Sequence, residues 1–404
     1  MLKVIRTRLT AILLMSGLFA AVTAADEKNI PEPFRGETKG SPIEIRYDDW
    51  NAILDMTVID AGTSDRSAAS APRPEIGTRS VRGNTSSTRN EGNRIAFPAF
   101  ADYEENLKIL ETIKTELEAL PDQAPLRLWT KNEQLAYWLN LYNISIIIQL
   151  TKEYPVKSLR DLHEGSRKEP SLWDQKLMKV ANIDLSLNDV HNILVEKWDS
   201  TIVMYGLFQG YVGGPSIQDQ AYTGRTVHKL LIENAKEFVN SNRGMRPKGS
   251  TLHISEYYKE NKKLFPDWEE DLKKHFISLT EFSWHDRIRG AKRIKATTDD
   301  YYIADLYAGS SSKGTASASN PAALTTALVS SNDGAAQILP GVNFGIGDWN
   351  LDTYANYQLA PIESRFPEYV TEYIQKMRKN KSLRPGNVDV EEVESEDDKK
   401  DRNN

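Results

Sequence analysis

Residues 128–150 read LWTKNEQLAYWLNLYNISIIIQL, and this stretch decides the fold. Thr130 is followed three positions later by Glu133, which is the spacing of a capping box. In that motif the Thr hydroxyl accepts the Glu133 backbone N–H, and the carboxylate reaches back to the cap. The apolar residues that follow lie on two helical stripes: Leu135, Leu139, Tyr142 and Ile146 on one, and Tyr137, Leu141, Ile144 and Ile148 on the other. A helix that is apolar on every side belongs inside a core, so we expect a buried central helix.

Two amides interrupt this apolar helix. Asn140 and Asn143 lie three residues apart and therefore share one helix face with Ala136 and Ile147. Buried amides must be hydrogen-bonded, which leaves two interpretations open. Either the pair lines the floor of a ligand pocket, or it binds neighbouring backbone within the core.

The bulk composition excludes several classes of function. The chain has 404 residues, a net charge of -6 and a pI near 5.7, so it lacks the basic excess of a nucleic-acid-binding protein. There is no cysteine, which removes disulfides, thiol catalysis and thiolate metal sites. The sequence also lacks an HExxH zinc motif, a GxSxG elbow and a phosphate-loop lysine motif. We expect no metal and no cofactor.

The first 25 residues have the pattern of a secretory signal peptide. Lys3, Arg6 and Arg8 form a basic head, residues 9–22 form an apolar run, and small residues follow. The alternative is a membrane anchor, for which the apolar run is short. We expect cleavage after Ala24 or Ala25, and a periplasmic or secreted protein with no membrane span once the signal is removed.

The rest of the chain divides by composition. Residues 26–42 predict a linker, and residues 43–353 predict a single domain of the α+β class, helix-dominated, with a small β-sheet around the buried central helix. Residues 61–94 and 308–334 predict mobile loops within it. Residues 354–377 predict a C-terminal helix, and the charged residues 378–404 predict a disordered tail. The six arginines of the 61–94 loop suit either a solvated loop or an anionic partner surface.

Apolar spacing predicts the elements of this domain. Residues 43–60 and 103–120 have helical spacing, and Pro121 and Pro125 end the second helix. Ser186 caps a helix that runs to residue 198, and residues 226–240 are helical as well. Residues 202–208 and the segment around Leu252 favour strands of the small sheet, and the central helix is expected to pack behind it. Residues 173–185 favour a strand pair or an extended segment.

Four segments resemble one family, the bacterial and plant domain of unknown function 547. They are residues 134–143 (QLAYWLNLYN), similar to the family's AFWINLYNA; 154–159 (YPVKSL), similar to YPVKSI; 185–190 (LSLNDV), similar to SLNDIE; and the Gly213-Gly214-Pro215 loop followed by Ala221-Tyr222. Residues 348–352 (DWNLD) resemble the family's closing YDWSLN. The resemblance covers roughly residues 43–353 and indicates an exported, proteobacterial-type member.

The chain departs from the family pattern at two places. Family members show HFALxCAS before the glycine loop, whereas residues 204–211 read MYGLFQGY in this chain, so Met204 replaces the histidine and Gln209 replaces the cysteine. In the helix after Ser186, family members show Glu-His where this chain has His191-Asn192. A thiol-based activity inferred for relatives therefore does not carry over to this chain.

Gln209 and the glycine loop after it are the leading candidate for a binding site. Glycines let backbone approach a ligand closely and can expose consecutive N–H groups to an anion. A glutamine side chain adds donors and an acceptor. The alternative is a tight structural loop beside the core. The candidate binding residues are Gln209, Gly210, Tyr211, Gly213, Gly214, Asn140 and Asn143.

The candidate catalytic residues are His191, Gln209 and Glu133. A histidine can act as a general base near neutral pH, and a glutamine amide can stabilise an oxyanion. Glu133 is either a helix cap or a pocket carboxylate. No nucleophile is evident, but convergence of His191, Gln209 and a carboxylate on one cleft would favour catalysis. We expect Gln209→Ala to weaken ligand binding with little change in stability, because loop side chains serve recognition.

Two functions remain open. The first is a non-catalytic binding protein of the cell envelope that uses the Gly-rich loop pocket to bind a small molecule or an envelope polymer. The second is a hydrolase or transferase that acts on envelope peptides or glycans without a cysteine nucleophile. The sequence leaves the choice between binding and catalysis open.

Overall fold

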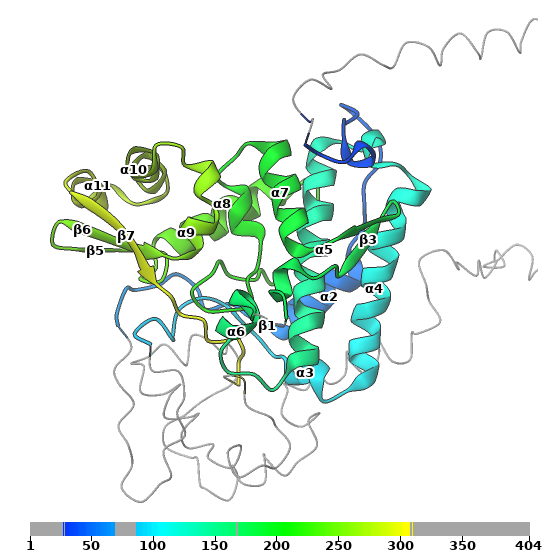
Figure 1. Ribbon diagram of the computed structural model, residues 1–404, viewed down its shortest axis with the longest axis horizontal. Helices are drawn as coiled ribbons and strands as arrows, with labels where there is room; N and C mark the ends of the chain where they lie inside the picture. Colours follow the sequence, from blue (N-terminus) through cyan, green and yellow to red (C-terminus); the bar gives the residue numbers. More distant parts are fainter. Residues whose placement is uncertain (1–26, 28, 69–85, 167–168, 308, 310–404) are drawn as a thin grey trace, which may run out of the picture. The chain divides into compact units, whose positions relative to one another are not determined.

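The structure, a computed structural model, describes residues 27, 29–68, 86–166, 169–307 and 309 (Figure 1). Several predicted segments lie outside these residues. They are the signal peptide (1–25), the centre of the 61–94 loop, the 308–334 loop apart from Gly309, the closing motif at 348–352, the C-terminal helix (354–377) and the charged tail (378–404).

Helices dominate the described part of the chain, and the strands are short, so the predicted α+β class is confirmed. The α-helices are α2 (Asp48–Thr57), α3 (Pro98–Ala101), α4 (Glu104–Gln123), α5 (Lys131–Glu153), α6 (Arg160–Glu164), α7 (Leu187–Trp198), α8 (Val227–Val239), α9 (Tyr257–Glu260), α10 (Trp268–Leu279) and α11 (Phe282–Arg289). The 3-10 helices are η1 (Glu32–Phe34), η2 (Leu126–Leu128), η3 (Leu172–Asp174), η4 (Val203–Gly206) and η5 (Lys262–Leu264). The strands are β1 (Val58–Ile59), β2 (Arg94–Ile95), β3 (Met178–Val180), β4 (Ile183–Leu185), β5 (Met245–Lys248), β6 (Thr251–Ser255) and β7 (Arg293–Thr298).

The expected central helix is α5, and nearly every residue from Glu133 to Thr151 is buried. The Thr130 side chain accepts the Glu133 backbone N–H at 3.2 Å, as predicted. The second half of the capping box was wrong, because the Glu133 carboxylate accepts the backbone N–H of Ile45 at 3.3 Å instead. The helix begins at Lys131, directly after the predicted cap Thr130, and the preceding residues Leu126–Leu128 form η2.

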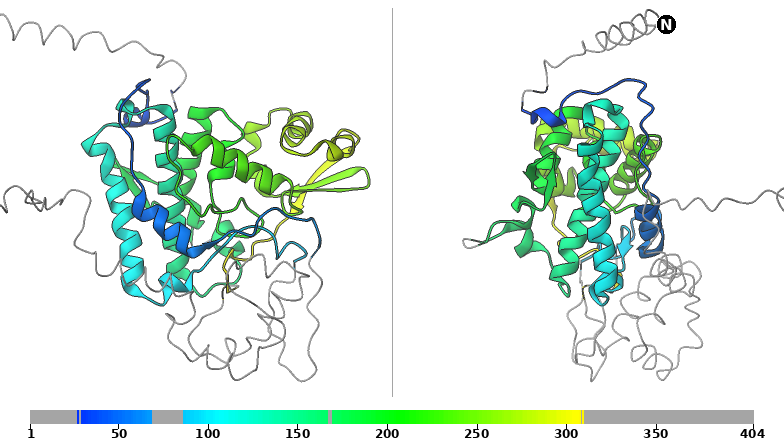
Figure 2. Two further views of the ribbon diagram at one scale, coloured as in Figure 1. Left: turned by 180° about the vertical axis from the view of Figure 1, so that it is seen from behind. Right: turned by 90° about the vertical axis from the view of Figure 1, so that its right-hand side faces the viewer.

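Other helices enclose α5. Helix α4 runs alongside it, α7 and α8 contact it elsewhere, and α2 crosses α4 on the face seen from behind (Figure 2). Pro121 does not end α4, which continues to Gln123. A proline removes one backbone donor, and the helix continues for only two residues beyond it. The enclosure by helices on several sides explains why the sequence of α5 is apolar on every face.

The strand predicted at residues 202–208 was wrong. Residues 203–206 form η4, and all of them are buried. Side-chain amides replace the partner strand: Asn143 donates to the Gly206 carbonyl and accepts the Phe208 N–H, both at 3.0 Å, and Asn234 donates to the Tyr205 carbonyl at 2.6 Å. Because buried backbone must be paired, these amides allow an apolar, β-prone segment to cross the core without a sheet.

The largest sheet has the order β5-β6-β7, with β5 and β6 antiparallel and β6 and β7 parallel. The predicted strand at Leu252 is part of β6 and is confirmed. Met245, Leu252 and Ile254 point into a core shared with η4, α8, α10 and α11. No α5 residue belongs to that core, so the prediction that the central helix packs directly behind this sheet was wrong. Helix α8 lies between them (Figure 1).

Several local predictions are confirmed by the structure. β3 and β4 form an antiparallel hairpin, and its turn residues Ala181 and Asn182 both have positive φ, which suits a two-residue turn. Ser186 and Asp189 form a complete capping box at the start of α7. β1 pairs with β2, which fixes the two ends of the 61–94 segment side by side. Within that segment, Arg66 donates to the Met245 carbonyl at 2.8 Å, so this arginine is engaged within the fold.

Candidate functional site

A cavity of about 480 Å³ lies between α7, η3 and the α9–η5 segment, and we call it the His191–Gln209 cavity. Its floor is made of buried side chains from four parts of the chain: Tyr142, Trp173, Gln209 and Tyr257. Polar side chains form the rest of the lining: His163, Glu164, Ser171, Asp174, Asn188, His191, Asn192, Glu260, Asn261 and Lys263, together with Val195 and Leu264. The cavity therefore combines an aromatic floor with a polar rim.

Gln209 is locked into the floor by three hydrogen bonds. Its side-chain carbonyl accepts the Trp173 indole N–H at 2.9 Å. Its amide nitrogen donates to the Tyr142 hydroxyl at 2.9 Å and to the Leu207 carbonyl at 3.0 Å. Both amide N–H groups are therefore used by the protein, and only 3 % of the residue is exposed. In this arrangement Gln209 shapes the floor and has no free donor for an oxyanion.

His191 projects from α7 into the same cavity. Its Nε2 lies 2.8 Å from the Asn261 side-chain oxygen, and the Asn261 amide nitrogen donates to the Tyr257 carbonyl at 3.0 Å. The amide oxygen can only accept, so His191 Nε2 carries the proton and Nδ1 keeps its lone pair. Burial lowers the pKa of His191, which favours the neutral ring near pH 7.

A carboxylate also reaches this cavity. Glu260, at the end of α9, lies 3.4 Å from His163 Nε2. The His163 ring packs edge-on against Trp173 and Tyr211, with centroid separations of 4.7 and 5.6 Å. His191, Gln209 and a carboxylate therefore line one cleft, as the catalytic hypothesis requires.

The backbone of the glycine loop is engaged within the protein. The N–H groups of Val212 and Gly213 donate to the Tyr302 and Asp300 carbonyls at 2.9 and 2.8 Å, and the Gly214 N–H donates to the Tyr211 carbonyl at 3.2 Å. Gly210 adopts φ of 74°, and a Cβ there would lie 2.2 Å from a Leu150 methyl carbon. A Cβ on Gly214 would lie 2.9 Å from Gln209 Cβ. Close packing accounts for these glycines.

Asn140 and Asn143 bind backbone on both sides of their amides. Asn140 donates to the Tyr222 carbonyl at 2.7 Å and accepts the Tyr222 N–H at 3.1 Å. Asn143 holds η4 in the same manner. Neither lines the His191–Gln209 cavity, which α5 reaches through Tyr142. This geometry agrees with the second of the two interpretations of these amides, in which they bind neighbouring backbone within the core.

Glu133 lies apart from the His191–Gln209 cavity, at the start of α5. Burial raises the pKa of its carboxyl group. Its nearest neighbours include Gly224, where a Cβ would lie 2.2 Å from the carboxylate oxygen. Glu133 thus connects the start of α5 with the segments around Ile45 and Gly224, and it is not brought together with His191 and Gln209.

Sequence reasoning missed several residues of the cavity. His163, Trp173, Tyr257, Glu260 and Asn261 come from three separate segments, and no spacing in the sequence links them. The cap at Ser186 fixes the start of α7. From that start, the sequence could have predicted that Asn188, His191 and Asn192 share one face of the helix. The position of α9 depends on long-range packing, which no local pattern encodes.

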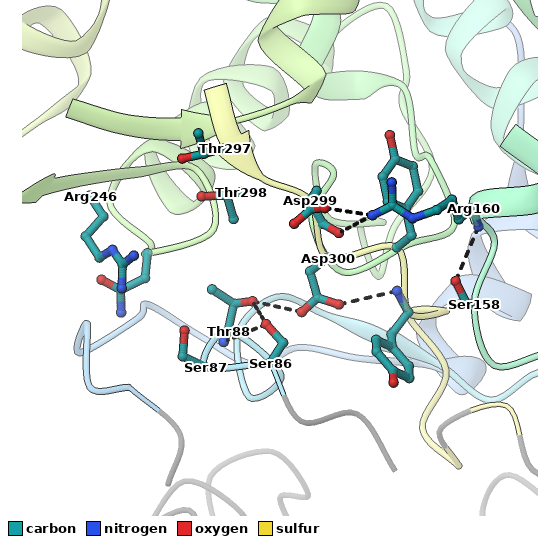
Figure 3. A pocket seen from close by; sticks show the side chains of 13 residues that line it. Ser86, Ser87, Thr88, Ser158, Arg160, Arg246, Thr297, Thr298, Asp299 and Asp300 are labelled. Atoms are coloured by element: carbon teal, nitrogen blue, oxygen red, sulfur yellow. Dashed lines mark hydrogen bonds and ion pairs between the residues drawn. The ribbon is translucent and has the colours of Figure 1, made fainter. Parts of the chain in front are cut away.

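A second cavity, of about 440 Å³, lies at the end of β7 (Figure 3). Asp300 accepts the Thr88 hydroxyl at 2.8 Å, and Arg160 pairs with Asp299 at 2.7 Å. Most of its lining carries hydroxyl groups. None of the candidate binding or catalytic residues named from the sequence lines it, so we place the candidate site in the His191–Gln209 cavity.

Across the described ranges, no group of three or more His, Asp or Glu side chains is placed to hold a metal ion. The same residues contain no helix that is long and apolar enough to span a bilayer.

The fold and the cavity define an α+β protein built on a buried helix, with a small-molecule-sized pocket along one side of its capped helix α7. Residues 126–239 match the sequence model of a family described as "Protein of unknown function, DUF547", so the family resemblance is confirmed over this part of the predicted range 43–353. This range contains α5, α7 and Gln209. Searches of curated proteins and of solved structures found no match.

Proposed function

We propose that the chain is a non-catalytic binding protein that takes a small polar molecule into the His191–Gln209 cavity. The observation that carries this proposal is the saturated Gln209 amide, because neither of its N–H groups is free to stabilise an oxyanion. The cavity volume of about 480 Å³ also suits such a ligand, since small-molecule pockets range over about 300–1,000 Å³.

The charges of the rim favour a neutral or cationic ligand. Glu164, Asp174 and Glu260 line the cavity, against a single lysine, Lys263. The N–H groups of Val212, Gly213 and Gly214 in the glycine loop already bind carbonyls, so they are not free to cradle an anion. An aromatic floor with amide and carboxylate groups around it suits a ligand rich in hydroxyl and amide groups, such as a fragment of an envelope glycan or peptide.

A blocking substitution tests this proposal. Asn192 is exposed on α7 and lines the cavity, so Asn192→Trp would fill it with little strain on the fold. Glu196→Trp on the same helix is the matched control, because Glu196 is exposed and does not line the cavity. Both variants and the wild type would be incubated with cell-wall digest, and the retained molecules identified by mass spectrometry. Retention by the wild type and the control alone supports the proposal, and equal retention by all three contradicts it.

The second candidate function is hydrolysis by water attack. One observation favours it: His191 is neutral, with Nδ1 unprotonated, in a cavity that also contains the Glu260 carboxylate. His191 would then act as general base for water. The two functions differ in the state of the recovered ligand. A binding protein returns it unchanged, whereas a hydrolase returns cleaved product that disappears in His191→Gln.

We also propose that the chain acts in the periplasm or outside the cell. Support comes from residues 1–25 of the sequence alone, with their basic head, apolar run and small residues. Fusing residues 1–30 to a reporter that folds only after export tests this, and cytoplasmic retention of the reporter would refute it.

A further inference from the structure

One face of the three-stranded sheet carries an unusual concentration of positive charge. The strand register aligns side chains in rows across β5, β6 and β7. One row holds Lys248, Thr251 and Arg293, and the next holds Arg246, His253 and Lys295. Each row thus has a cation on both outer strands, and the four cations together form what we call the basic face.

The basic face points away from the core. Side chains alternate between the two faces of a sheet, and the intervening residues Met245, Leu252 and Ile254 are fully buried, with Ile294 and Ala296 packed against the same core. Arg246, Lys248, Arg293 and Lys295 are all exposed. The sheet therefore presents a flat cationic surface to its surroundings.

The four cations have no carboxylate partner, whereas several other surface cations do. Lys152 pairs with Glu111, Lys176 with Asp189 and Arg225 with Glu44. Within the described part of the chain, none of the four basic-face cations forms an ion pair with a carboxylate. Their field is also felt at the centre of the face: burial lowers the pKa of His253, and the charges of Arg246, Lys248 and Lys295 lower it further.

The clustering of four cations costs electrostatic free energy when the protein has no partner. Arg246 and Lys248 share a face of β5, as Arg293 and Lys295 do on β7, so like charges repel each other along each outer strand. The chain as a whole carries a net charge of -6. Mixed charges would serve solubility without this repulsion. The four positions point away from the core, so packing does not require a positive charge at any of them. An anionic partner explains why all four are cationic.

We propose that the basic face docks the chain onto the anionic headgroups of a membrane surface, a property separate from ligand binding in the His191–Gln209 cavity. The strands offer a plane of charge, which matches a layer of headgroups. The second cavity lies beside the basic face, and Arg246 and Thr297 both line it (Figure 3). Asp299 and Asp300 in that cavity repel an entering anion, which disfavours it as the site of a small anionic ligand. No Phe, Tyr or Trp side chain occupies the two rows, so the large aromatic platform of a single-stranded nucleic-acid site is missing there.

The expected strength is modest. Each Lys or Arg near an anionic bilayer strengthens binding about fivefold, so four of them together contribute a factor of several hundred at low salt. Because the Debye length shrinks as salt is added, binding should weaken steeply with ionic strength.

Co-sedimentation of the full chain with lipid vesicles tests the proposal. The vesicles would contain phosphatidylglycerol and phosphatidylcholine, or phosphatidylcholine alone. Binding through the apolar run at residues 9–22 would hold the chain on both, so the difference between the two vesicles is the readout. The face variant is R246Q/K248Q/R293Q/K295Q. The control variant, with the same net charge, is K39Q/K152Q/K229Q/K236Q, which removes four exposed lysines elsewhere.

We expect the wild type and the control to bind anionic vesicles within twofold of each other, and the face variant to bind at least tenfold more weakly. Equal binding by the face and control variants would overturn the proposal, as would a wild type that binds a single-stranded oligonucleotide but not anionic vesicles. If the fourfold face variant melts early, K248Q/K295Q and a salt titration of the wild type replace it. Binding by the wild type that does not fall with salt would then refute the proposal.

Discussion

The Trp173 indole N–H donates to the Gln209 side-chain carbonyl across 2.9 Å, and this bond joins η3 to the segment that follows η4. The Tyr142 hydroxyl from α5 accepts from the other end of the same amide. Three distant parts of the chain therefore meet at the position where the resemblance predicts a cysteine in relatives. Gln209 is a structural residue of the cavity floor, so the role expected of it from the sequence changes.

Gln209→Ala should destabilise the protein, contrary to the expectation from sequence. The substitution leaves the buried Trp173 N–H without its acceptor and the Leu207 carbonyl without a donor. Each buried polar group that loses its partner costs about 1–3 kcal/mol, so we expect the two groups together to cost roughly 2–6 kcal/mol. Urea denaturation followed by tryptophan fluorescence measures it.

The control for this measurement is Asn192→Ala. Asn192 lines the same cavity but is exposed, and surface substitutions usually change stability by less than about 0.5 kcal/mol. If Gln209→Ala proved as stable as Asn192→Ala, the three hydrogen bonds of Gln209 would contribute nothing to the fold, and the rigid floor would not exist.

The contrast between η4 and the two capped helices shows what the sequence could predict. Thr130 and Ser186 start their helices through contacts three residues away, so the pattern was sufficient. Residues 202–208 have strand-like composition, yet Asn143, 63 positions before Gly206, binds their backbone and makes a 3-10 helix. The cavity could not be predicted from the sequence for the same reason, because His163, His191 and Glu260 come together only when α6, α7 and α9 pack against one another.

Asp305 should make the protein less stable as pH rises from about 4 to 6. Its carboxyl group accepts from the Tyr154 hydroxyl at 3.0 Å and from the Gly309 N–H at 2.8 Å, and burial raises its pKa to about 6, from an ordinary value of 3.8. The folded state therefore binds the extra proton in this window, and stability falls as that proton is lost.

The measurement compares Asp305→Asn with the wild type from pH 4 to 7. The variant lacks the titration, so the wild type should lose about 3 kcal/mol relative to it over this range. Taking the difference between the two proteins removes the contribution of every other group. A difference that is flat with pH, or one that shifts in favour of the wild type, would contradict the assignment to Asp305.

His275 should act in the opposite direction. Its ring accepts or donates at 2.6 Å to the Tyr205 hydroxyl, and burial lowers its pKa to about 4, from an ordinary value of 6.5. The folded state binds fewer protons than the unfolded chain between these values, so the stability contributed by the neutral ring is lost as pH falls from 6.5 to 4. His275→Gln should therefore gain about 3 kcal/mol on the wild type over that fall. The difference in unfolding free energy between variant and wild type should change with pH in opposite directions for Asp305→Asn and His275→Gln. A change in the same direction for both would refute this prediction.

Asn143→Leu should destabilise the core more than any exposed substitution on the same helix. The leucine fills a similar volume but leaves the Gly206 carbonyl and the Phe208 N–H unpaired in a buried segment. Two such groups cost roughly 2–6 kcal/mol together. Asn132→Leu is the matched control, since Asn132 lies on α5 but is exposed and bonded only to His228. We expect the control to change stability by less than about 0.5 kcal/mol, measured by urea denaturation. Equal stability of the two variants would mean that the amide of Asn143 does not hold η4, and the absence of a strand at residues 202–208 would then need a different physical cause.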